Sequence, residues 1–69
     1  MSKKITFEVQ ILQGGRWETH ASYPGDQQGQ AIQDAKALEN ISTVTSVKVI
    51  REEIDPDSGA AQENNIFAS

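Results

Sequence analysis

The last third of the chain has the pattern of a β-hairpin. Residues 44–54 are rich in valine and isoleucine and predict a long strand, and residues 60–67 predict a return strand. Between them stands Asp-Pro-Asp-Ser-Gly, a run of turn-forming residues. We expect Ile54 to face Ala60 across this turn and Val47 to face Phe67. The hairpin constrains the architecture, but it carries no catalytic, metal-binding or nucleotide-binding motif.

A second hairpin is predicted at the other end of the chain. Residues 5–11 and 16–23 each alternate apolar and polar side chains, as strands with one buried face do, and a glycine pair separates them. A two-residue Gly-Gly turn would place Ile11 opposite Glu18. A three-residue loop, with Gly15 in the left-handed conformation, would place Ile11 opposite Trp17. We therefore predict the three-residue loop and expect Trp17 to lie in the core.

One helix is predicted between the hairpins. Pro24 and Gly25 end the preceding strand, and Asp26 is the predicted N-cap. Four apolar residues then recur at helical spacing and form one stripe, namely Ala31, Ile32, Ala35 and Leu38.

These elements predict one α+β domain, over residues 1–69, with the order ββαββ. A helix that returns across the sheet delivers the third strand beside the first. We therefore expect a four-stranded antiparallel sheet of order 2-1-3-4 with the helix on one face.

The composition excludes several classes of protein. The chain of 69 residues has no cysteine, so disulfides and thiolate metal sites are impossible. No apolar run resembles a secretory signal or a membrane span, and we expect a cytoplasmic protein. The net charge of -4 makes nucleic acid an improbable partner.

No residue pattern indicates catalysis or a cofactor. The acidic turn that begins at Asp55 resembles the start of a calcium-binding EF-hand loop, but Ala60 stands where the loop needs glycine and Ile66 where it needs glutamate. His20 is the only histidine, and no partner for it can be inferred. We expect no enzyme activity, no metal and no cofactor.

Several motifs together resemble a group of short bacterial proteins for which no activity is agreed. They are residues 14–17 (GGRW), 35–39 (AKALE), 47–53 (VKVIREE), 55–59 (DPDSG) and 66–67 (IF). The layout is also similar, in topology only, to small ββαβ ribosomal and antitoxin domains. This chain lacks the basic surface of the first and the DNA-binding segment of the second, so the resemblance implies a fold and no functional residue.

The sheet face away from the helix is the predicted binding surface. We expect it to carry Leu12, Ile50, Ile54 and Ile66, and grouped apolar residues on an exposed sheet face are typical of a contact site. The leading hypothesis is a non-enzymatic interaction module, either a homodimer through this face or a small subunit of a larger protein. The alternative is a nucleic-acid-related binding domain or an acidic mimic of nucleic acid.

Overall fold

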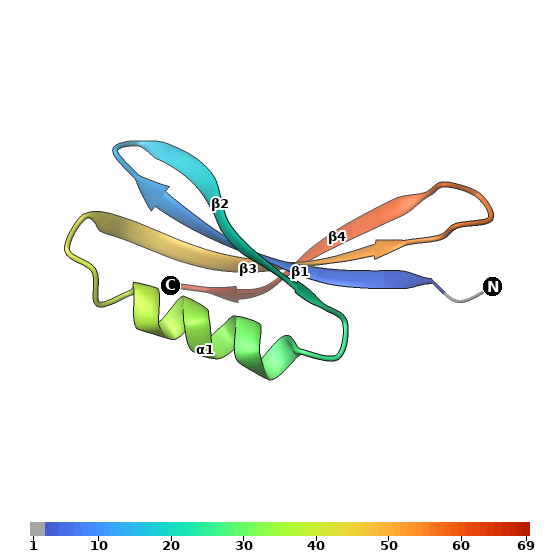
Figure 1. Cartoon of the computed structure of the whole chain (residues 1–69). Helices are drawn as coiled ribbons and strands as arrows, with labels where there is room; N and C mark the ends of the chain where they lie inside the picture. Colours follow the sequence, from blue (N-terminus) through green and yellow to red (C-terminus); the bar gives the residue numbers. More distant parts are fainter. Residues whose placement is uncertain (1–2) are drawn as a thin grey trace.

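The computed structural model describes residues 3–69 and has the expected element order. The elements are β1 (Lys4–Gln13), β2 (Arg16–Pro24), α1 (Gln28–Leu38), β3 (Val44–Ile54) and β4 (Ala61–Ala68). The strands form one antiparallel sheet in the order β2-β1-β3-β4. The helix lies along one side of the sheet, while the tips of the two hairpins project beyond it (Figure 1). The predicted α+β fold and strand order are confirmed.

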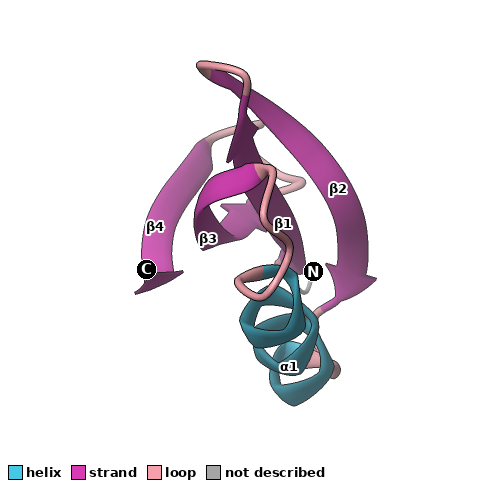
Figure 2. Ribbon diagram, turned by 90° about the vertical axis from the view of Figure 1, so that its left-hand side faces the viewer, coloured by secondary structure: helices cyan, strands magenta, loops and turns pink. Residues whose placement is uncertain are grey.

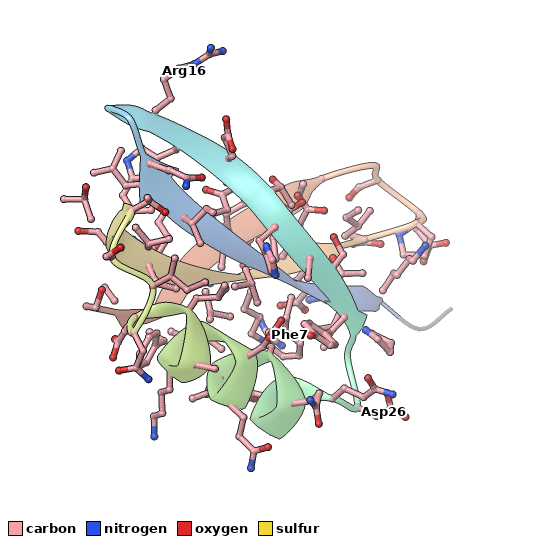
Figure 3. All side chains as sticks on the ribbon, turned by 60° about the vertical axis from the view of Figure 1, so that its left-hand side comes forward. Phe7, Arg16 and Asp26 are labelled. Carbon is pink, nitrogen blue, oxygen red and sulfur yellow. The ribbon has the colours of Figure 1, made fainter. Side chains whose placement is uncertain are left out.

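The core lies between α1 and the two central strands. Alternate residues of β1 and β3 point toward the helix, and the apolar ones among them are buried, because strand side chains alternate between the two faces. From α1, two alanines and a leucine pack down onto them, and the small alanines let the helix approach the sheet closely. Phe7, only 1% exposed, lies between sheet and helix (Figure 3). The core consists of Phe7, Val9, Ile11, Ala31, Ala35, Leu38, Val47 and Val49.

The helix is attached to the sheet differently from the sequence prediction. Its N-cap is Gln27, which makes no side-chain capping bond, so the prediction of Asp26 was wrong. The Gln27 amide donates to the carbonyl of Pro24 at 3.0 Å, which places Asp26 inside a tight turn, one residue too early to cap the helix. A hydrogen bond of 2.6 Å from the Tyr23 hydroxyl to Asp34 Oδ2 joins β2 to α1.

The turn between β1 and β2 has two residues, so the predicted three-residue loop was wrong. Gly14 and Gly15 have φ angles of 61° and 77°, and two successive positive φ angles are the signature of the type I′ turn that suits twisted strands. Ile11 consequently faces Glu18. At His20, β2 has one extra residue that pairs with no residue of β1, and this irregularity of the β-bulge kind places Val9 opposite Ala21. The pairing of apolar with polar residues, such as Ile11 with Glu18, is thus confined to the tip of the hairpin.

The hairpin of β3 and β4 also departs from the predicted register. The Asp55 amide donates to the Ala60 carbonyl at 2.8 Å, and this closing pair places Ile54 opposite Ala61. A second irregularity, at Ile66, brings Val49 opposite Phe67. The expected pairs of Ile54 with Ala60 and of Val47 with Phe67 were therefore each displaced.

Candidate interaction surface

The sheet side opposite α1, called the open face below, is covered by no helix among residues 3–69 (Figure 2). It is formed by alternate residues of all four strands, and most of those on the central strands are half-buried by their neighbours in the sheet. The apolar residues of the open face are Leu12, Trp17, Ile50 and Ile54. Its acidic residues, called the acidic row below, are Glu8, Glu52 and Glu63, and Lys48 lies between Trp17 and the acidic row.

Trp17 belongs to the open face and not to the core. Because the turn has two residues, Trp17 stands opposite Leu12, and 45% of its surface is exposed. The ammonium of Lys48 on β3 lies 4.1 Å from the centroid of its ring, a cation–π contact. Since β1 lies between β2 and β3, the indole must reach across β1. The expectation of a buried Trp17 was wrong, and the residue is instead the largest apolar group on this face.

Ile66 is the predicted surface residue that the structure places elsewhere. It is the extra residue of the β4 irregularity, is half-buried, and packs with Phe67 against the core. Leu12, Ile50 and Ile54 remain on the open face, half-exposed. The exchange of Ile66 for Trp17 follows from the registers that the two turns impose, which pair Leu12 with Trp17 and Ile54 with Ala61. The irregularities at His20 and Ile66 then return Ala21 and Phe67 to the helix side. The glycine pair, which favours a two-residue turn, was the signal that could have placed Trp17 correctly.

Three carboxylates from adjacent strands form the acidic row. Glu52 faces Glu63 across β3 and β4, and Glu8 of β1 is diagonal to Glu52. Partial burial, a hydrogen bond with the Glu63 side chain and repulsion by both neighbours raise the pKa of Glu52 above its ordinary value. The row therefore offers concentrated negative charge at the end of the open face away from Trp17.

On the helix side, the projecting hairpin of β3 and β4 carries a small charge network. Glu53 accepts from Arg51 at 3.1 Å and pairs with Lys3 at 3.2 Å, and these two partners lower the pKa of Glu53. The side chains of Arg51 and Glu53 are half-buried and that of Lys3 is exposed, and ion pairs in contact with water contribute little to stability. We regard them as a solvated part of the hairpin and not as a site.

The possible metal ligands and the surface hollows are the remaining candidate sites in the described part of the chain. Residues 3–69 contain no group of three potential metal ligands, and His20 is exposed. Two shallow hollows of about 80 and 280 Å³ lie, respectively, beside Glu53 and at the end of α1 beside Val44. Ligand pockets are usually larger than either. The acidic turn uses an oxygen of Asp55 internally, to accept the amide of Asp57 at 3.0 Å.

Comparisons with known proteins leave the surface itself as the evidence for function. No family model, curated protein or solved structure matches the chain. Within residues 3–69, the one helix is too short and too polar to cross a membrane.

Proposed function

We propose that this chain is a non-enzymatic protein-interaction module that binds a partner protein through the open face. The observation that carries the proposal is the half-exposed Trp17, which stands on β2 opposite Leu12. Tryptophan is enriched among the residues that dominate binding energy at protein interfaces, since a large ring can be buried at little cost in conformational entropy. The contact of Trp17 with Lys48 orients the ring before a partner arrives.

The chemistry of the open face indicates what the partner must offer. Trp17 and Leu12 require an apolar patch, and the acidic row requires basic side chains at the other end of the contact. A mixed interface of this kind gives modest affinity with a polar rim. A homodimer through the open face is the less favoured form of the proposal, because the second copy would offer the acidic row three further carboxylates.

A capture experiment with matched variants tests the proposal. The tagged chain, its Trp17→Ser variant and its Ile41→Ser variant are each incubated with lysate of the source organism, and captured proteins are quantified by mass spectrometry. Ile41 is the control, because it is 46% exposed but lies in the loop after α1, away from the open face. We expect a captured protein that Trp17→Ser loses and Ile41→Ser retains.

The identified partner is then titrated into the purified chain. Trp17 is the only tryptophan of the chain, so its fluorescence, after the emission of the partner alone is subtracted, reports on burial of the open face. A blue shift on binding is expected. The proposal fails if no captured protein depends on Trp17, or if the partner binds without changing the indole emission. The double substitution of Ile50→Ser with Ile54→Ser should weaken the same partner while the helix-side core stays folded.

A further inference from the structure

The two edges of the sheet differ in how well they are protected against pairing with another strand. On the β2 edge, Pro24, the irregularity at His20 and the charges of Arg16 and Glu18 are features that discourage edge pairing. The β4 edge has no proline and no basic residue, and its only charged residue is Glu63. Its irregularity at Ile66 leaves the segment 61–65 regular.

The segment 61–65 of β4 is accessible along its whole outer side. The packing of α1 is against β1, β2 and β3, and this part of β4 belongs to the hairpin that projects away from the helix (Figure 1). All five residues are exposed. A further strand could therefore be added here without displacing any element of the fold.

The hydrogen bonds to β3 define which backbone groups of β4 point outward. The Ala60 carbonyl accepts a hydrogen bond from the Asp55 amide, so the backbone groups of Ala60 point toward β3. Along an antiparallel strand, the amide and carbonyl groups of successive residues point alternately to one neighbouring side and to the other. The backbone groups of Asn64 therefore also point toward β3. The amide and carbonyl groups of Glu63 and Asn65 point away from the sheet, and no strand of residues 3–69 lies beside them.

From this geometry we infer that two copies of the chain pair through their β4 edges, antiparallel and with the two-fold axis at Asn64. In this register Glu63 of each copy faces Asn65 of the other, and the two residues exchange their outward backbone hydrogen bonds. A register centred on Glu63 would instead place two carboxylates directly opposite each other. One centred on Gln62 would run into the turn at Ala60. The register centred on Asn64 keeps both pairs of Glu63 with Asn65 inside the regular segment and meets the irregular Ile66 only beyond them. The result is a continuous sheet through both copies.

Edge pairing and the proposed function are independent of each other. The dimer uses backbone groups at the rim of the sheet, so Trp17 and Leu12 remain free in both copies. Loss of Trp17 should leave the dimer intact. Glu63 belongs to the acidic row, so the effect of losing the dimer on partner binding is judged between Glu63→Pro and Glu63→Ala, which both lack the carboxylate, and these two variants should bind a partner equally well. Either proposal can therefore fail alone.

The first test removes one outward donor. Glu63→Pro deletes the outward amide without removing a bond to β3, and proline is tolerated at such edge positions. Glu63→Ala is the control, because it keeps the amide and removes the charge. Sedimentation at roughly millimolar protein, where even a weak dimer is populated, should show dimers for the wild type and Glu63→Ala and monomers for Glu63→Pro. A monomeric wild type, or a Glu63→Pro variant that dimerises equally well, overturns the inference.

The second test remains decisive if Glu63→Pro fails to fold. The chain has no cysteine, so Asn64→Cys introduces a single thiol at the proposed axis. Facing residues that do not exchange hydrogen bonds have Cα atoms about 4.5 Å apart, within the range of a disulfide. Asn64→Cys should form disulfide-linked dimers roughly tenfold or more faster than Gln62→Cys, because pairing raises the effective thiol concentration only at the axis. Equal rates, or faster linkage at Gln62→Cys, overturn the inference.

Discussion

Replacement of the two aromatic residues Phe7 and Trp17 by alanine should have unequal effects on stability. Phe7 is 1% exposed, and truncation of a fully buried aromatic costs about 3 to 5 kcal/mol, since both packing and the space it filled are lost. Trp17 is 45% exposed. A tryptophan that buries roughly 200 Å² when fully covered would lose about 100 Å² of contact here, or about 2 kcal/mol once compactness of the unfolded chain is considered.

Urea unfolding followed by circular dichroism measures both losses on the same scale. The parent and both variants should unfold with the same urea dependence, so that midpoints convert into free energies of unfolding. We expect Phe7→Ala to lose about twice as much as Trp17→Ala. In the folded parent, acrylamide should quench Trp17 readily. A Trp17→Ala variant as unstable as Phe7→Ala, together with a shielded indole, would refute the placement of Trp17 on the open face.

Three further predictions follow from the turns and the acidic row. Gly14→Ala and Gly15→Ala should each cost about 1 kcal/mol in thermal unfolding, since both residues have positive φ and an added Cβ would meet no atom within 4 Å; a loss at Gly15 alone would restore the three-residue loop. Asp26→Ala should change the free energy of unfolding by less than about 0.5 kcal/mol, because Asp26 does not cap α1, and a loss typical of an N-cap would contradict the observed turn. The raised pKa of Glu52 means that the folded chain holds the proton more tightly than the unfolded chain, so stability falls as the pH rises through the folded pKa. Glu52→Gln should therefore melt at a higher temperature than the wild type at neutral pH, and the two melting temperatures should converge below pH 4.5, the ordinary glutamate pKa. An equal difference at neutral pH and below pH 4.5 would show that burial and Glu63 do not raise the pKa of Glu52.

The fold could be predicted from the sequence because its signals are local and periodic. The alternation through Phe7, Val9 and Ile11 defines β1 and its buried face, and the spacing of Ala31 and Ala35 defines the face of α1 that packs on it. Short connections and the return of the helix across the sheet then leave few possible strand orders. Leu12, Ile50 and Ile54 were placed on the open face by the same alternation.

The tertiary structure, and not the alternation within each strand, determines that Trp17 lies on the open face and that Ile66 does not. An irregularity such as those at His20 and Ile66 is a property of two paired strands, and neither residue differs in sequence from an ordinary strand residue. Side chains alternate with a period of two, so a shift of one residue transfers every following side chain to the other face. The turn registers place Trp17 on the open face and Ile66 against the core, and the irregularities return Ala21 and Phe67 to the helix side. The candidate site therefore depends on pairing geometry that no single strand encodes.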